Sequence, residues 1–239
     1  MSPNNPHTAM TEAEYWRDYE IIKNDVLASI VSYQTHNTLN SLAARDPEVY
    51  QKINRHANFW NISSSSWQTT LFIVLARILD HDPKVHSIYQ VLNATIAHPE
   101  FFSKPALRAR KLAIPGTQWN PADLDDYVRN AWEPTVQDLR MMKRALVPHK
   151  TKFDAIYRPI RNQIAHIILK DQVLIAALYS RTQKTDIDEL LCFLHSLIGA
   201  IWHLAFNATP PDLTGDNYGY ATRIAEIATD IETLLGQLP

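Results

Sequence analysis

Apolar residues recur at helical spacing near the start of the chain. Aromatic and aliphatic side chains follow one another at intervals of three or four positions, at Trp16, Tyr19, Ile22, Val26 and Ile30. Thr11 precedes this pattern and Glu14 stands three residues later, which is the arrangement of a capping box. The pattern therefore predicts a helix from about residue 11 to about residue 43.

Polar residues and prolines divide the rest of the chain into further helical segments. Asp46 and Pro47 predict the start of a second helix, whose apolar face reaches Trp60. The serines at 63–66 predict the cap of a strongly apolar third helix that stops before Pro83. Further helices are expected at 86–97, 122–145, 157–171, 185–207 and 220–235, and Pro148 is expected to break the chain between two of them.

Two segments depart from this helical pattern. Prolines and a glycine interrupt residues 98–121, where we expect a peripheral insertion. Residues 172–180, QVLIAALYS, are compatible with either a short strand or a helix. Since no repeat or low-complexity tract is present, we predict an all-α fold: one helical bundle over residues 1–239.

Composition narrows the classes of partner. Hydrophobic residues make up 46% and charged residues 20% of the chain, and the formal net charge is −2, so any phosphate-binding site must be local. The one cysteine, Cys192, excludes a disulfide framework or a thiolate metal cluster within one chain.

The start of the chain does not resemble a signal peptide, and the apolar run at 190–206 favours a core helix over a membrane span. We expect a cytoplasmic protein with no membrane partner.

The usual sequence signals of metal and cofactor enzymes are missing. Glycine-rich phosphate loops, nucleophile elbows and paired-cysteine metal sites do not occur, so no cofactor is expected. The stretch DHDPKVH, from Asp80 to His86, gathers acidic and histidine side chains but straddles a helix end and Pro83. A surface turn is favoured over a metal site, and no metal is expected.

One helical segment carries an unusual set of polar residues. Residues 157–171 read YRPIRNQIAHIILKD, and their apolar side chains gather on one side of an ideal helix. Asn162 and His166, four residues apart, lie opposite that side, while Arg161 flanks them and Arg158 lies near the same stripe. An arginine fork, an amide and an imidazole suit a phosphodiester, whereas the carboxylates that a magnesium site needs are missing.

The spacing of arginine and histidine in this motif is not rare by itself. Arginine followed by histidine five residues later occurs twice, at Arg144 with His149 and at Arg161 with His166. In the first copy Pro148 is expected to break the helix, so that the two residues would share no face. If asparagine must follow the arginine directly, the number of matches expected by chance in a chain of this composition falls to roughly 0.03. Only the second copy has this asparagine.

The motif RNQIAH on an amphipathic helix resembles the signature of the HEPN superfamily. A second stretch, FWNISSSSWQTTLFIVLARILDHDP, is similar to a core helix of the AbiU-like abortive-infection group and ends in Arg77 and Asp80. These two residues also have the spacing of an ordinary ion pair within a helix. The resemblance implies a HEPN-like core at 46–207, with helical extensions at both ends.

The resemblance implies a metal-independent endoribonuclease, in which a ribose 2′-hydroxyl attacks the adjacent phosphate. His166 would then transfer the proton, Arg161 would hold the phosphate and Asn162 would orient the pair. Three further residues are assigned to substrate binding: Arg158, Arg77 and Asp80. A role in prokaryotic phage defence or a toxin-like stress response would follow.

The expected partners are RNA or a nucleotide and a second copy of the chain. One helix offers one histidine, so a homodimer would supply a second proton-transfer group. Some HEPN proteins carry a modifiable tyrosine two residues after the histidine, but Ile168 stands there and we expect no such antitoxin control. Because the chain is not basic, RNA affinity would come from a patch including Arg158 and Arg161, or from a partner protein.

Two other functions are compatible with the same residues. The chain could be a non-catalytic HEPN-like module that binds nucleotides or dimerises for a partner protein. It could also be a helical scaffold on which Arg161, Asn162 and His166 are a solvated stripe.

Overall fold

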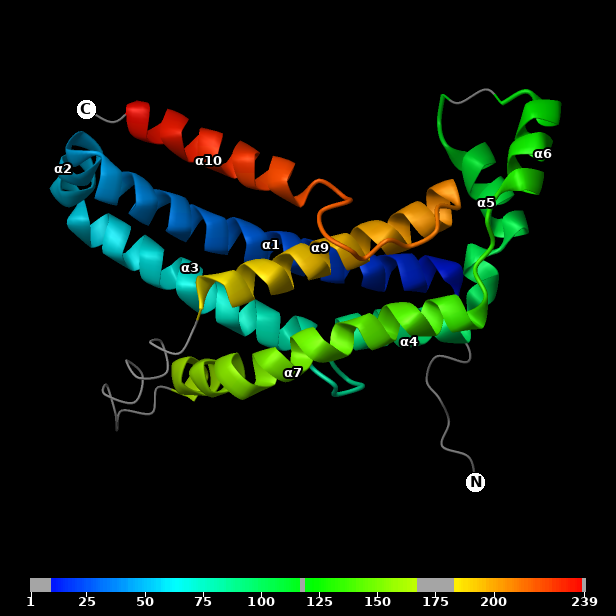
Figure 1. Cartoon of the computed structure of the whole chain (residues 1–239), viewed down its shortest axis with the longest axis horizontal. Helices are drawn as coiled ribbons and strands as arrows, with labels where there is room; N and C mark the ends of the chain where they lie inside the picture. The colour runs from blue at the N-terminus through cyan, green and yellow to red at the C-terminus, as the bar shows by residue number, and fades with distance from the viewer. Residues whose placement is uncertain (1–9, 117–118, 167–182, 238–239) are drawn as a thin grey trace.

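The computed structural model describes residues 10–116, 119–166 and 183–237, with the backbone alone described over 156–166. These residues form an elongated bundle of α-helices with one short 3₁₀-helix, and no strand occurs among them (Figure 1). The predicted all-α fold is confirmed. The segment 172–180, whose sequence is compatible with either a strand or a helix, lies outside the described residues.

Helix α1 (Glu12–Arg45) runs through the length of the bundle, with α3, α9 and α10 packed along it (Figure 1). The expected capping box begins it: the Glu14 amide donates to Thr11 Oγ1, and the Thr11 amide donates to Glu14 Oε2 at 2.8 Å. The predicted apolar face of α1 is buried, at Tyr15, Tyr19, Ile22, Val26 and Ile30. This helix is therefore the central element of the core.

Helices α2 (Pro47–Arg55) and α3 (Ala57–Ile78) correct one predicted boundary. The chain breaks at His56, and the serines at 63–66 lie inside α3 rather than capping a new helix. Their hydroxyls find partners within the bundle: Ser64 Oγ lies 2.9 Å from His36 Nδ1, and Ser66 Oγ donates to the carbonyl of Ile62. The bond of Ser64 to His36 joins α3 to α1, which favours helix over a cap at this position.

Prolines begin helices in the segment that we expected at the periphery. After α4 (Ile88–Ala97), a 3₁₀-helix (Pro99–Phe102), α5 (Lys104–Ala113) and α6 (Pro121–Asn130) each carry proline in the first turn, where its missing N–H costs no hydrogen bond. Phe101 and Phe102 are buried against Tyr15, with ring centroids 5.7 Å away. The segment 98–121 thus contributes to the core as well as to the surface.

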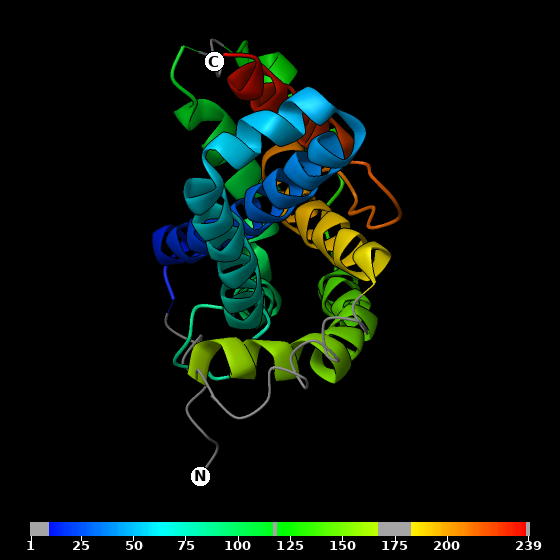
Figure 2. The ribbon, with the colours of Figure 1, turned by 90° about the vertical axis from the view of Figure 1, so that its left-hand side faces the viewer.

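Helix α7 (Val136–His166) corrects the expectation that Pro148 would end a helix. Both Pro148 and Pro159 lie within it, and the helix bends along its length (Figure 2). Proline inside a helix removes one backbone hydrogen bond and kinks the axis without necessarily ending it. Arg144 and His149 therefore lie on one helix. The expectation that Pro148 would separate them, which excluded this first copy of the motif, is wrong.

Helices α9 (Lys184–Asn207) and α10 (Tyr220–Gly236) complete the bundle. By length and composition α9 could cross a membrane, but most of its apolar window is buried here, as the core helix expected from the sequence. Gly199 lets Tyr218 approach α9, because a Cβ atom at this position would lie 2.7 Å from the Tyr218 ring. The loop between α9 and α10 is thereby held against the core.

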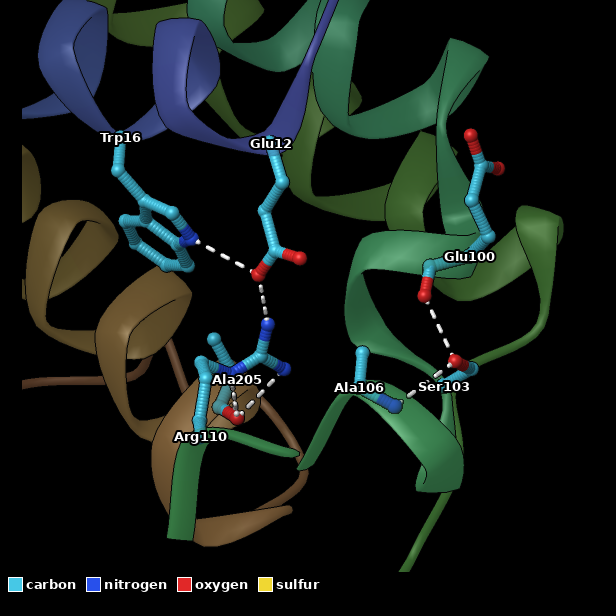
Figure 3. Close-up of polar contacts among 7 residues, drawn as sticks. All are labelled: Glu12, Trp16, Glu100, Ser103, Ala106, Arg110 and Ala205. Atoms are coloured by element: carbon cyan, nitrogen blue, oxygen red, sulfur yellow. Dashed lines mark hydrogen bonds and ion pairs between the residues drawn. The ribbon is translucent and has the colours of Figure 1, made fainter. Parts of the chain in front are cut away.

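A nearly buried arginine joins three helices at the end of the bundle (Figure 3). Arg110 of α5 forms an ion pair with Glu12 of α1 and donates to the carbonyl of Ala205 in α9, with Nη2 at 2.9 Å and Nε at 3.1 Å. Its guanidinium lies beside the rings of Trp16 and Phe206, 5.9 and 5.4 Å from their centroids, and these two rings contact each other. Each guanidinium nitrogen contacts a protein oxygen, so this arginine stabilises the fold.

Candidate functional site

The motif RNQIAH forms the carboxyl end of α7, and His166 is the last helical residue. The helix predicted for Arg161, Asn162 and His166 is confirmed. The side chains of these three residues, and of Arg158, lie outside the described part of the chain. Their arrangement around one phosphate stays a prediction.

The middle of α7 is fixed to α9 just before the motif. Lys152 Nζ lies 2.5 Å from Asp186 Oδ1 and 3.2 Å from Glu189 Oε2. One turn earlier, the ring of His149 stacks on Phe193 with centroids 4.1 Å apart. Burial lowers the pKa of His149, which favours its neutral form. These contacts assign His149 a packing role and leave the RNQIAH copy as the candidate for proton transfer.

The other side of α7 packs against α4. Lys143 Nζ donates to Asn93 Oδ1 at 2.6 Å, and Phe153 is buried in the core. Burial, with a smaller contribution from Asp154, raises the pKa of Tyr89 to about 12, so this phenol stays protonated at neutral pH. The motif thus follows a segment of α7 that is held from both sides.

Arg77 lies in an ion pair that the sequence did not predict. Its Nε donates to Asp25 Oδ2 at 2.8 Å, and its Nη2 contacts Asp25 Oδ1. The carboxylate belongs to α1, whereas Asp80 accepts the backbone N–H of Asp82 in the turn after α3. Asp25 could have been noticed from the sequence, because it occurs on the buried face with Ile22 and Val26. Substrate contacts by Arg77 and Asp80 stay a prediction.

The stretch DHDPKVH forms a surface turn, as expected. Asp80 and Asp82 each accept a backbone N–H two residues on, and His86 Nδ1 lies 3.6 Å from Asp18 Oδ1. Across the described ranges, no three His, Cys, Asp or Glu side chains come together as a metal site would require.

Two half-buried histidines elsewhere are held in the fold. His36 lies between α1 and α3, where Ser64 contacts its Nδ1 and Gln68 and Asn40 contact its Nε2. Burial lowers the pKa of His36 and of His195 on α9, so both favour the neutral form. Both are partly buried groups between packed helices, but Nδ1 of His195 is buried with no hydrogen-bond partner in the described part of the chain.

Comparison with protein-family models assigns the chain to a family. A family model described as AbiU2, of the HEPN type, matches residues 8–224 and so covers most of the chain. No curated protein and no solved structure matches.

Proposed function

The chain belongs to the AbiU2 family of HEPN domains, a family of abortive-infection proteins, and from this premise we propose that it is an endoribonuclease. The observation that carries the proposal is the sequence Arg161, Asn162 and, four residues later, His166, at the end of one long helix. This spacing brings residues of the required chemistry to neighbouring positions on a helix.

The reaction needs proton transfer and charge stabilisation. The ribose 2′-oxygen forms a bond to phosphorus while the bond from phosphorus to the 5′-oxygen breaks, which leaves a 2′,3′-cyclic phosphate and a 5′-hydroxyl. An imidazole accepts the proton of the 2′-hydroxyl, and a second acid donates a proton to the leaving 5′-oxygen. Arg161 offers donors to the non-bridging oxygens, whose negative charge grows in the transition state. His166 is assigned the proton transfer, and Asn162 is assigned the orientation of the two.

A homodimer would supply the second proton-transfer group that one motif lacks. Each chain has one His166, whereas the reaction uses both a base and an acid. Two chains with their α7 ends at one cleft would provide two imidazoles and two guanidiniums. The carboxyl end of α7 lies beyond the contacts that Lys152 makes with α9, and in Figure 1 it lies along the lower edge of the bundle, short of α2.

The test is cleavage of diverse single-stranded RNAs by the full chain in the presence of a chelator. His166→Ala is expected to abolish cleavage, since removal of a general acid or base costs roughly 10²–10⁴-fold in rate. His56→Ala is the matched control, because His56 is exposed at the start of α3 and its side chain makes no capping hydrogen bond. Equal cleavage by the two variants would overturn the proposal. RNA binding or dimerisation that depends on His166 without any cleavage would support the non-catalytic module instead.

A further inference from the structure

A hollow of about 610 Å³ lies between α4 and the amino-terminal half of α7. Figure 1 shows α4 behind this part of α7, and the two helices are in contact. Seven residues line the hollow: Asn93, Ile96, Ala97, Arg140, Lys143, Arg144 and Val147. We propose that this hollow, called here the α4–α7 groove, binds the phosphates of an RNA strand.

The groove collects three cations on one helical face. Arg140, Lys143 and Arg144 are three and four residues apart on α7, which places them side by side. Arg140 and Arg144 are exposed, and Lys143 is half-buried with its ammonium bonded to the Asn93 amide. Like charges at this spacing repel one another and destabilise a helix. An anion bound between them would remove that repulsion.

No carboxylate balances these cations in the described part of the chain. Residues 139–153 contain no aspartate or glutamate, and α4 contains no charged residue at all. Arginines on two other helices do have carboxylate partners, as Arg108 has Asp125 and Arg223 has Glu226. The groove is therefore a local positive region on a chain whose formal net charge is −2.

The chemistry of the groove favours phosphates over other anions. Two arginine forks and one ammonium match the non-bridging oxygens of successive phosphodiesters. Ile96 and the exposed Val147 give apolar surface beside the charges, against which a sugar or base can lie. No aromatic side chain lines the groove, so base stacking is not part of its recognition. We expect binding that depends on the backbone and is indifferent to sequence.

The position of the groove on α7 identifies the ligand as RNA, an inference that rests on the proposed function. Arg144 and Arg161 are 17 residues apart on the same helix, so at most about 26 Å of helix axis separates them. A stacked strand covers that distance in about eight nucleotides, at roughly 3.4 Å each. A strand longer than this can contact the groove and the motif at once, whereas a very short one cannot.

Binding is measured in the His166→Ala background, so that the result does not depend on catalysis. The probes are fluorescently labelled single-stranded RNAs of about 20 and about four nucleotides, longer and shorter than this span. The groove variant carries Arg140→Gln, Lys143→Gln and Arg144→Gln. The matched control carries Arg108→Gln, Arg129→Gln and Arg223→Gln, which removes the same charge from exposed, ion-paired arginines. Thermal melts of both variants check that the fold is intact.

The groove variant is expected to bind the long RNA at least about tenfold more weakly and to lose up to about two units of salt-dependence slope, since each phosphate contact contributes roughly 0.7. The parent should bind the long RNA more tightly than the short one, which cannot contact the groove and the motif at once, and the control should keep both affinities. Unchanged binding of the long RNA by the groove variant, or an equal loss in the control, would overturn the proposal. Displacement of the long RNA by ATP at equal phosphate concentration would also overturn it, in favour of a free nucleotide.

Failure of this inference is distinguishable from failure of the proposed function. If His166→Ala abolishes cleavage while the groove variant binds long RNA normally, and the same three groove substitutions in the wild-type chain leave cleavage unchanged, the ribonuclease stands and the groove is rejected. If the wild-type chain cleaves no RNA but the groove variant loses binding, the groove stands and the ribonuclease is rejected.

Discussion

Arg77 of α3 and Asp25 of α1 form a two-pronged ion pair, in which Arg77 Nε lies 2.8 Å from Asp25 Oδ2. The aspartate side chain is 12% exposed and the arginine side chain 48% exposed. The carboxylate thus depends on this guanidinium for its hydrogen bonds, while the arginine also reaches solvent. The pair joins the two longest neighbouring helices of the amino-terminal half.

Asp25→Ala is expected to lower the free energy of unfolding by about 1–2 kcal/mol, because a hydrogen-bonded charge pair is lost and water screens the arginine that remains. A double-mutant cycle with Arg77→Ala, followed by urea denaturation, measures the coupling between the two side chains. We expect about 1 kcal/mol of coupling. Additive effects of the two substitutions would contradict a structural role for the pair.

Arg110→Lys is expected to lower the free energy of unfolding by about 1.5–3 kcal/mol. Lysine keeps the charge beside Glu12 but cannot also donate two hydrogen bonds to the carbonyl of Ala205 (Figure 3). It also lacks the planar group that lies beside the rings of Trp16 and Phe206. Urea denaturation measures the change, with Arg108→Lys as the control because Arg108 pairs with Asp125 at the surface. Equal losses in the two variants would exclude a special role for Arg110.

His149 should make the fold less stable as the pH falls. Burial, mainly, lowers the pKa of His149 in the folded chain, with Lys152 acting in the same direction and Glu189 opposing it. At neutral pH and above, the imidazole is neutral in both states and contributes nothing. As the pH falls through the ordinary histidine value of about 6.5, the unfolded chain takes up the proton first, which favours unfolding.

His149→Phe keeps a ring against Phe193 and removes the titrating group. The free energy of unfolding of this variant should decline less steeply than that of the wild type between pH 7 and pH 5. Some decline should remain, because burial also lowers the pKa of His36 and His195. Parallel declines in the two proteins would show that His149 does not titrate in this way.

Mixing the wild-type chain with an inactive variant tests whether the site is shared between subunits. His166→Ala is expected to be inactive alone, and a dimer of one wild-type and one variant chain has one imidazole instead of the two that the reaction uses. An excess of His166→Ala should therefore lower the cleavage activity of a fixed amount of wild-type chain after the subunits exchange. If that activity stays unchanged while mixed dimers are detected by mass spectrometry, each site uses one chain only.

Much of the helical architecture could be predicted from periodicity and caps. The capping box of Thr11 and Glu14 and the start of α2 at Pro47 were predicted from local chemistry, which short stretches of sequence specify fully. The boundaries that failed depended on distant residues. The serines at 63–66 stay helical because His36 and the preceding turn bond to them, and no local rule reveals that partner.

The prolines mark a second limit of local reasoning. Pro148 signals a helix end in isolation, but contacts of α7 with α4 and α9 on either side, such as Lys143 with Asn93 and Lys152 with Asp186, hold the helix through it. The expectation that Pro148 ends a helix also kept the cations of the groove from being considered together. Arg144 was set aside with His149, although the sequence RMMKR shows like charges at helical spacing and residues 139–153 contain no aspartate or glutamate.

The family and the helix that carries the candidate site could be predicted from the sequence, while the site itself stays a prediction. The low-chance motif indicated the HEPN superfamily, and the match over residues 8–224 confirms that assignment. The ion pair of Asp25 with Arg77 could not be specified, because it joins residues 52 positions apart on different helices. Only the packing of α3 on α1 brings them together.

The most direct test of the central claim uses the attacking group of the substrate. Two RNAs of one sequence are incubated with the wild-type chain and with His166→Ala in chelator, one RNA unmodified and one carrying 2′-O-methyl groups at every position. The account predicts that the wild type cleaves only the unmodified RNA and leaves 2′,3′-cyclic phosphate ends, and that His166→Ala cleaves neither. Cleavage of the methylated RNA, or cleavage of the unmodified RNA by His166→Ala at the wild-type rate, would contradict it.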